Sequence, residues 1–513
     1  NYNVAVGYVA GKAVTSGIRN NFFGAESGEA LTTGDDNIAI GYQTLTSETA
    51  GNRTVAIGGN ALDAQNSSTD SNMYNVGVGY AAGGAITTGS DNVLIGGLAA
   101  DALTDASFNV AIGTSALGSD TLGSRNIAIG VSALAAQNFT TATDAYNVAV
   151  GVLAGLSVTT GTQNVLIGGL AGDAITTGDN NVALGHEALT ANTVGDRSTA
   201  LGNFALKSQN PATNTDMYNV AIGHNAGGDV TTGLNNTLIG GLAGDALTTA
   251  EGNVAVGYGT LSASTKSAQN VAIGNIALLS LNHTTTTNSY NVAVGGSAGR
   301  NITTGVQNTL IGGLAGDSLQ DADANVAVGT SALGADTFGS RSTAVGLGAL
   351  ESQNFTTATQ TYNTAVGYSA GAAVTTGIDN VLVGGLTGDA LTTGQDNVVM
   401  GGGALGADTK GSRTVAIGRA ALQSQNFTTA TNTFNVAVGY LAGGSVTTGI
   451  FNTLIGGGAG DALTTGDRNV VVGKDALSSD TKGQRSVAIG ESALDAQNFT
   501  TDTQTYNTAV GYF

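Results

Sequence analysis

The chain has 513 residues, of which 10% are charged, 80 are Gly, one is Pro and none is Cys. Its formal net charge of −20 argues against nucleic-acid binding, which needs clustered Lys and Arg, and the lack of Cys excludes disulfides and thiolate metal sites. No run of eighteen apolar residues occurs, so the sequence predicts no membrane contact within this segment.

A pentad of the type Asn147-Val148-Ala149-Val150-Gly151 recurs 29 times along the chain. Successive pentads are 17, 17, 17 and 21 residues apart, and this cycle of 72 residues occurs seven times. The blocks are 3–74, 75–146, 147–218, 219–290, 291–362, 363–434 and 435–506. Such a period is typical of solenoids, in which each repeat stacks on its neighbours. We therefore predict an all-β, parallel β-solenoid that is one continuous domain over 1–513, with about 28 coils and a length of about 130 Å at ~4.8 Å per coil.

Each coil begins with a strand at the pentad. Its second and fourth residues are mostly Val, Ile or Thr, which predicts β structure with these side chains in the core. The third residue is apolar or Gly in every coil, although alternation places it on the opposite face. In the second coil of six blocks it is Leu, at Leu94, Leu166, Leu238, Leu310, Leu382 and Leu454. Because a lone rod would expose this stripe, we predict that these Leu side chains meet at the axis of a homotrimer.

The first and fifth pentad residues predict structural roles. The first is Asn in 24 coils and Ser or Thr in five, and stacked Asn side chains would form a ladder that satisfies backbone groups. The fifth is Gly in all 29 pentads, which predicts a positive φ or a close backbone contact at a turn. In the first coils these turn residues include Gly79, Gly151, Gly223, Gly295, Gly367 and Gly439.

The rest of each coil predicts a return path. A small-residue segment such as 170–172 leads to a second expected strand, 174–177, and Gly178 precedes the turn to the next Asn. Two strands and two turns would make a flattened roll, in which the opposite strand supplies the crossover that parallel strands require. A triangular β-helix of near 18 residues per coil is the alternative. The fourth coil has four extra residues, and Pro211 in this insertion predicts a loop outside the hydrogen-bond ladder.

Acidic residues form two columns. In the second coils they are Glu29, Asp101, Asp173, Asp245, Asp317, Asp389 and Asp461, and in the third coils Glu48, Asp120, Asp336, Asp408 and Asp480, each followed five residues later by Arg. Calcium binds several oxygen ligands, so the second-coil Asp residues, one in each of six blocks from Asp101 onward, are weak candidates for a metal site. Equivalent acids recur only once per block, roughly 19 Å apart at ~4.8 Å per coil, which favours surface salt bridges or turn caps. We predict no resident cofactor.

An aromatic residue ends each block: Tyr74, Tyr146, Tyr218, Tyr290, Tyr362, Phe434 and Tyr506. An exposed column of this kind could stack on sugars, but the sequence favours a plug that covers the core beside the insertion. The insertions also carry Asn-x-Thr or Asn-x-Ser, at Asn66, Asn138, Asn282, Asn354, Asn426 and Asn498. These match glycosylation acceptors, and we expect them to be unmodified in a bacterial or phage product.

Nothing in the sequence predicts catalysis. His186, His224 and His283 fall in different blocks and at unrelated distances from any Ser or acid. Gly-rich turns recur in every coil, so none predicts a phosphate-binding loop at the start of a helix. We predict that the protein is not an enzyme.

The pentad followed by a small-residue segment, as in Asn126-Ile127-Ala128-Ile129-Gly130-Val131-Ser132-Ala133, resembles the head repeats of YadA-type trimeric autotransporter adhesins. This resemblance covers essentially the whole chain. It implies a left-handed parallel β-roll, a trimer, extracellular exposure and attachment to surfaces. The coils here are longer than in those heads, and the long fourth coil is foreign to them. Similar long-coil arrays also resemble tail-fibre proteins of marine phages.

The expected function is an extracellular structural fibre or adhesin at the cell surface. Its expected partners are itself, in a homotrimer or filament, and an unidentified cell-surface or environmental ligand. A virus tail fibre or capsid-attached fibre on the virion surface is the alternative. A third possibility is an ice-binding face made of Thr-Thr columns, although the third coils interrupt them. Both chain ends fall inside the repeat, so we also expect a segment of a longer protein.

Overall fold

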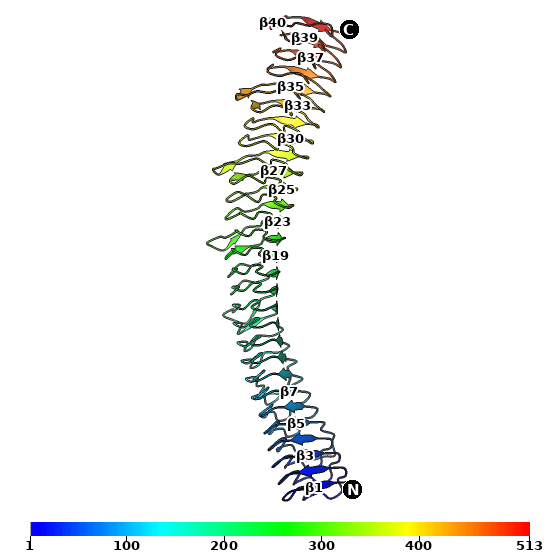
Figure 1. The fold of residues 1–513 in the computed structure, drawn as a ribbon, viewed down its shortest axis with the longest axis vertical. Helices are drawn as coiled ribbons and strands as arrows, with labels where there is room; N and C mark the ends of the chain where they lie inside the picture. The colour runs from blue at the N-terminus through cyan, green and yellow to red at the C-terminus, as the bar shows by residue number, and fades with distance from the viewer. Residues whose placement is uncertain (1) are drawn as a thin grey trace. The chain divides into compact units, whose positions relative to one another are not determined.

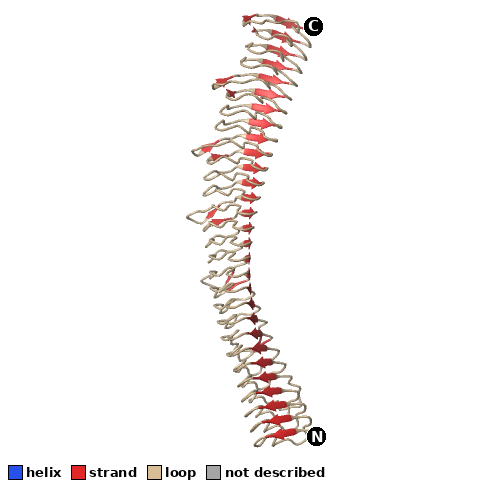
Figure 2. Cartoon of the chain, in the orientation of Figure 1, coloured by secondary structure: helices blue, strands red, loops and turns tan. Residues whose placement is uncertain are grey.

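The computed structural model describes residues 2–513, which form two compact units divided between Asn253 and Val254. All regular secondary structure in the described residues is β-strand (Figure 2). These residues contain no helix that could cross a membrane. Within each unit the strands stack in parallel along the chain (Figure 1). The predicted all-β, parallel β-solenoid is confirmed.

In the first unit, fourteen three-residue strands occupy the second to fourth residues of successive pentads. They are β1 (Val4–Val6), β2 (Asn21–Phe23), β3 (Ile38–Ile40), β4 (Val55–Ile57), β5 (Val76–Val78), β6 (Val93–Ile95), β7 (Val110–Ile112), β9 (Ile127–Ile129), β11 (Val148–Val150), β12 (Val165–Ile167), β13 (Val182–Leu184), β15 (Thr199–Leu201), β17 (Val220–Ile222) and β18 (Thr237–Ile239).

The second unit contains fifteen such strands. They are β19 (Val254–Val256), β21 (Val271–Ile273), β23 (Val292–Val294), β24 (Thr309–Ile311), β25 (Val326–Val328), β27 (Thr343–Val345), β29 (Thr364–Val366), β30 (Val381–Val383), β31 (Val398–Met400), β33 (Val415–Ile417), β35 (Val436–Val438), β36 (Thr453–Ile455), β37 (Val470–Val472), β39 (Val487–Ile489) and β41 (Thr508–Val510).

Neighbouring pentad strands pair in parallel and in register. Val148 of β11 pairs with Val165 of β12, and Ala149 pairs with Leu166. Because each pair joins equivalent pentad positions, every column of the sequence repeat is also a column in space. The predicted correspondence of one pentad to one coil is therefore confirmed within each unit.

The prediction of which face of the pentad strand lies in the core is wrong. The third pentad residue faces the core, and the second and fourth residues, which were expected inside, lie on the outer surface. Ala149 is fully buried inside the solenoid, whereas Val148 and Val150 are only half-buried on its outer surface. The Leu column is fully buried within the single chain: Leu94, Leu166, Leu238, Leu310, Leu382 and Leu454 each have 0% exposure. The prediction that these residues form an oligomer stripe is wrong, because they fill the core of their own chain.

Glycine residues elsewhere in the coil explain why Leu is needed there. A Cβ on Gly155 would lie 2.8 Å from Leu166 Cδ1, and one on Gly172 would lie 2.7 Å from Leu166 Cδ2. In the third and fourth coils of the same block, Leu189 and Leu206 occupy the position of these glycines, and the pentad carries Ala instead. The large side chain therefore changes position from coil to coil while the core stays filled. Burying each Leu contributes about 1.5–3 kcal/mol to the fold of the single chain.

The predicted second strand is absent from the described 17-residue coils. Residues 174–177 form turns and bends. Backbone hydrogen bonds still join successive levels on this side, since Thr159 N donates to Thr176 O at 2.9 Å and Thr176 N donates to Thr193 O at 2.8 Å. The return path is thus a hydrogen-bonded ladder without strand geometry.

Two-residue strands occur where the fourth-coil insertion pairs with the third coil. They are β8 (Gly123–Ser124), β10 (Thr143–Asp144), β14 (Gly195–Asp196), β16 (Thr215–Asp216), β20 (Ser267–Ala268), β22 (Thr287–Asn288), β26 (Gly339–Ser340), β28 (Thr359–Gln360), β32 (Gly411–Ser412), β34 (Thr431–Asn432), β38 (Gly483–Gln484) and β40 (Thr503–Gln504). Asn52 and Asn72 form a single bridge at the equivalent place in the first block. Pro211 lies outside these strands, as predicted.

Candidate functional site

The pentad Asn residues form the predicted structural ladder. Asn147 Nδ2 donates to Gly161 O at 2.7 Å, and Asn147 Oδ1 accepts from Asn164 N at 2.9 Å. Both Asn side chains are fully buried. Each side chain therefore satisfies one backbone acceptor of its own coil and one backbone donor of the next, which uses its polar atoms for folding.

The turn glycines meet both predicted requirements. Gly295 has a φ of 140°, and a Cβ there would lie 2.4 Å from Gly312 O in the next coil. The same combination of positive φ and close approach to the next Gly occurs at Gly79, Gly151, Gly223, Gly367 and Gly439. Any side chain would therefore overlap the neighbouring backbone.

The aromatic column lies on the surface, so the prediction of a plug is wrong. The exposed fraction runs from 45% at Phe434 to 61% at Tyr506, and Tyr74, Tyr146, Tyr218, Tyr290 and Tyr362 lie between these values. In six blocks an Arg from the preceding level lies over the ring, with its Cζ 5.5–5.8 Å from the ring centroid. In block 435–506 the column continues with Phe451 stacked at 5.5 Å on Phe434.

This stacking decides what the aromatic column can do. Arg341 lies over Tyr362, and its Nη1 donates to the Tyr362 hydroxyl at 2.9 Å. The Arg side chain therefore occupies one face of the ring. The arrangement suits cation–π stabilisation of the surface better than stacking of a sugar on an open face.

The third-coil acids lie inside the solenoid and do not meet the Arg residues that follow them. Asp120 is fully buried, and its Oδ1 accepts from Gly123 N at 3.0 Å while its Oδ2 accepts from Gln137 Nε2 at 2.6 Å. Arg125 instead points outward, with its Nε 3.0 Å from Asp144 Oδ2. These acids are turn caps, one of the two roles, with surface salt bridges, that the sequence predicts.

The second-coil acids are half-buried at the surface. Burial raises the pKa of the carboxyl groups of Asp101, Asp317, Asp389 and Asp461 above the ordinary range. No group of three or more His, Cys, Asp or Glu side chains within residues 2–513 is arranged to hold a metal ion. The column Asp101, Asp173, Asp245, Asp317, Asp389 and Asp461 thus offers single carboxylates one block apart.

The first Thr of most return-path Thr-Thr pairs uses its hydroxyl within the fold. Thr159 Oγ1 donates to Thr176 O, and Thr176 Oγ1 donates to Thr193 O, at 3.1 and 3.0 Å. In the third coil Thr121 Oγ1 donates to Phe139 O at 2.8 Å and to Asn138 Oδ1 at 3.1 Å. Hydroxyls that already donate to the backbone are poorly placed to order water on a binding face.

The structure brings together one His–Ser pair that the sequence did not predict. His283 Nδ1 lies 2.9 Å from Ser267 Oγ, and its Nε2 lies 3.0 Å from Thr304 O. Ser267 is fully buried and His283 is 9% exposed, so a substrate has no access to this hydroxyl. The two residues are 16 positions apart, and only the coil stacking joins them.

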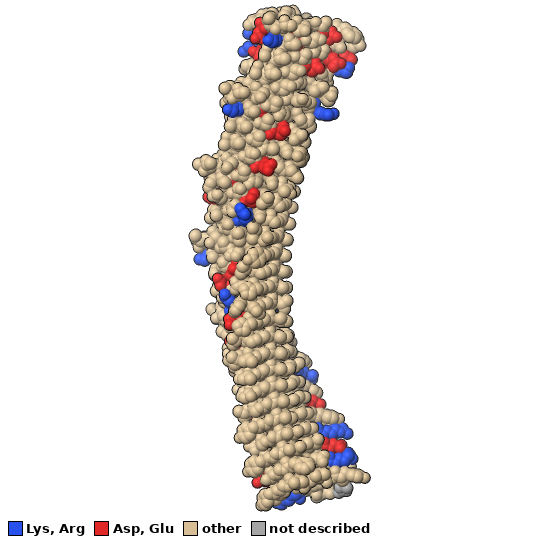
Figure 3. All heavy atoms as spheres, viewed as in Figure 1, with Lys and Arg blue, Asp and Glu red and all other residues tan. Residues whose placement is uncertain are grey.

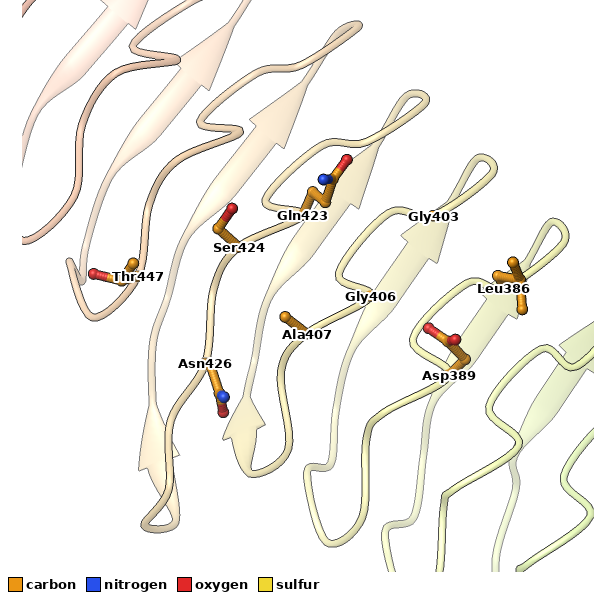
Figure 4. Close-up of a pocket in the computed structure, with 9 residues that line it drawn as sticks. All are labelled: Leu386, Asp389, Gly403, Gly406, Ala407, Gln423, Ser424, Asn426 and Thr447. Carbon is orange, nitrogen blue, oxygen red and sulfur yellow. The ribbon is translucent and has the colours of Figure 1, made fainter.

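A groove of about 660 Å³ lies on the surface of block 363–434 and is a candidate for ligand binding. Figure 4 shows its lining residues on successive coils, among them Leu386, Asp389, Gly403, Gln423 and Asn426. An adjoining space of about 410 Å³ shares Leu386, Gly403 and Gln423 and adds Arg419 and Tyr440. Asp389 and Asn426 belong to two separate sequence patterns, the acidic column and the Asn-x-Thr motif, and neither pattern indicates that the two residues border one groove.

A comparison with protein-family models finds none that matches the chain, and a comparison with curated proteins finds no match either.

Proposed function

We propose that the chain is the rigid repeat region of an extracellular or surface-attached fibre that mediates attachment. The observation that carries this proposal is the in-register parallel ladder, which repeats at every pentad pair described within each unit. The buried Asn ladder adds a second set of bonds between successive coils. Such a scaffold resists bending and local opening, which suits a spacer that holds a binding surface away from its base.

The localisation of the fibre can be tested with antibodies raised against this chain. Immunogold labelling of intact source cells or particles should decorate surface filaments. Label on virus particles would assign the filament to a virion, and label on cell envelopes would assign it to a cell appendage. Label confined to the cell interior would overturn the proposal.

We also propose that copies of the chain associate through the outer face of the pentad sheet. The second and fourth pentad residues, such as Val292 and Val294, line this face, and in all 29 coils neither position carries a charge. On the side of the molecule shown in Figure 3, charged side chains are scattered along the chain and most of the surface between them is uncharged. A second copy has the same spacing between coils, so it can match this face over many levels. In one unit this face measures about 70 Å by 10–15 Å. The surface buried on both partners together would approach that of a standard protein–protein interface.

Sedimentation velocity tests this association directly. The wild-type chain should sediment as an oligomer at micromolar concentration. Val292→Lys and Val294→Lys, combined with Lys at the equivalent two positions of several successive blocks, should yield monomer. Thr304→Lys, on an exposed turn away from this face, is the matched control and should leave the oligomer intact. A monomeric wild-type chain would contradict self-association.

A further inference from the structure

The groove on block 363–434 exists because its third coil lacks side chains that other blocks have. Gly402, Gly403 and Gly406 occupy the positions of His186, Glu187 and Thr190 in block 147–218. A Cβ on Gly403 would meet nothing within 4 Å, and one on Gly406 would lie 3.4 Å from Asp389 Oδ1. The space is therefore open for a ligand and borders a carboxylate.

That carboxylate has a different environment from its equivalent in block 147–218. There, Thr190 Oγ1 donates a short hydrogen bond to Asp173 Oδ1. In block 363–434 Gly406 replaces the Thr, so the Asp389 carboxylate lacks this hydroxyl donor. Burial raises the pKa of Asp389, against a hydrogen bond from its own backbone N–H. A ligand hydroxyl would supply the missing donor.

The rest of the lining offers complementary groups. Asn426 is exposed and lines the groove, and its Oδ1 accepts from Thr409 Oγ1 at 3.1 Å, so its amide nitrogen is the donor that it can offer to a ligand. Gln423 is exposed between the groove and the adjoining space, where Arg419 adds donors. Tyr440 and Leu386 are 58% and 46% exposed and provide apolar surface. The groove therefore offers an acceptor and donors, and the adjoining space, which shares Leu386, Gly403 and Gln423 with it, adds an aromatic surface.

Other ligand classes fit this lining less well. A metal ion needs several oxygen ligands, and Asp389 belongs to no group of three or more acidic or His residues in the described chain. A strongly anionic ligand would be repelled by Asp389, and an apolar ligand would leave the polar lining without hydrogen bonds. A sugar has hydroxyls that both donate and accept, together with apolar C–H faces.

We propose that this groove binds a neutral oligosaccharide, with Asp389 accepting hydroxyl protons, Gln423 and Asn426 donating, and Tyr440 packing against a ring face. The proposal rests on the proposed attachment function, because it supplies the ligand class and the place of contact. It assigns ligand binding to one place on the solenoid, the groove of block 363–434 and the start of the next block, although all seven blocks share the same period.

The test uses the full chain and an array of neutral oligosaccharides that includes cello-, chito-, malto- and mannooligosaccharides. Wild type should bind at least one of these series, and the Kd for that ligand is then measured by titration. Asp389→Asn should weaken binding roughly tenfold or more, because a hydrogen bond to a charged group is lost. Asp173→Asn, at the equivalent position in block 147–218, should leave the Kd unchanged.

A filled-groove variant separates ligand binding from folding. Gly403→Ser with Gly406→Thr installs residues that Ser331 and Thr190 already place at these positions in other blocks, so the coil accepts them. This variant should abolish binding while retaining the wild-type circular dichroism spectrum. Failure of the wild type to bind any array member, or unchanged binding by the filled variant, would overturn the groove proposal.

The two proposals fail in different ways. If surface filaments are labelled but the filled groove has no effect, the fibre stands and the groove assignment is wrong. If the groove binds a sugar but labelling is confined to the cell interior, the binding site stands and the fibre proposal is wrong.

Discussion

The corner between the third and fourth coils is built in two ways in adjacent blocks. In block 291–362, Asp336 and Gln353 are fully buried, and Gln353 Nε2 donates to Asp336 Oδ2 at 2.5 Å. In block 219–290 the equivalent residues are Ser264 and Leu281, which are also fully buried. The same backbone corner therefore holds either a carboxylate with an amide or a hydroxyl with an aliphatic side chain.

The corner of block 291–362 is a closed polar network. Asp336 Oδ1 accepts from Gly339 N and Phe355 N, both at 3.1 Å. Gln353 also donates to Ser342 Oγ at 2.8 Å and accepts from Asn363 Nδ2 at 2.9 Å. The network connects the acid to the Asn ladder.

The corner of block 219–290 lacks the hydrogen bonds between acid and amide that form this network. Leu281 offers no polar atom, and Ser264 Oγ has no hydrogen-bond partner among the described residues. His283 replaces the Phe of the other block and lies against Ser267. Acid and amide thus disappear together. A buried carboxylate is tolerated only with a full set of donors, and an aliphatic residue is the better neighbour once the charge is gone.

The largest effect is expected from Gln353→Leu, which gives block 291–362 the apolar residue of its neighbour but keeps the acid. Asp336 and Asn363 each lose a partner in a buried site, so local opening should become easier by about 3 kcal/mol. Hydrogen exchange of the Gly339 and Phe355 amides measures this. The equivalent amides Gly411 and Phe427 in the next block serve as an internal control, since stability in a repeat array is nearly a sum over neighbours. Unchanged exchange at Gly339 would contradict the network.

A smaller effect is expected from Ser264→Asp, which places a carboxylate in the corner that lacks the amide. Local stability of block 219–290 should fall by about 2 kcal/mol. Adding Leu281→Gln should recover most of this loss because it supplies the missing donor. If Ser264→Asp is as stable as wild type, the side-chain amide is not what permits a buried acid at this corner.

The coupling between the two positions can be measured in block 291–362. Adding Asp336→Ser to Gln353→Leu reproduces the neighbouring corner and removes the unpaired carboxylate. The double variant should be more stable than Gln353→Leu alone by about 1 kcal/mol, so its loss of stability should be smaller than the sum of the losses of the two single variants, as expected of residues in contact. Simple additivity of the two substitutions would show that the residues act independently.

The smallest effect is a dependence on pH. Burial raises the pKa of Asp336 above its ordinary value of 3.8, against the hydrogen bonds from Gln353, Phe355 and Gly339. Between 3.8 and the raised pKa the folded corner retains a proton that the opened chain has lost. Local stability of this corner should therefore fall as pH rises through that window and stay level above it. Asp336→Asn, which imitates Asn192 of block 147–218, should flatten the profile of Gly339 exchange once intrinsic exchange is corrected. A profile that rises with pH would reverse the assigned shift.

Much of the fold followed from the sequence because the period itself carries the information. The pentad count predicts the coils, the glycine at each fifth position predicts the positive φ seen at Gly295, and the Asn column predicts the buried ladder. These features depend on local backbone geometry and on a residue meeting its own equivalent in the next coil. Periodicity reports both directly.

The inward face of the strand could not be chosen by the same means. Period-two alternation states that Ala149 and Val150 lie on opposite faces, but both columns are apolar, so hydrophobicity alone does not say which face is inside. The volume left by Gly155 and Gly172 decides it, since only the inner face needs a Leu there. Recognising this requires knowing which residues of the coil face each other across the core.

The sequence by itself determined an all-β parallel stack with four coils per block, since repeat spacing and turn chemistry are properties of the chain. Only the tertiary structure decided that the aromatic column is exposed under its Arg partners, and that the third-coil acids are capped inside the core. It also decided that Gly403 and Gly406 open a groove beside Asp389. These outcomes depend on side chains from different coils and from opposite sides of one coil, and their meeting is set by how the return path folds across the core.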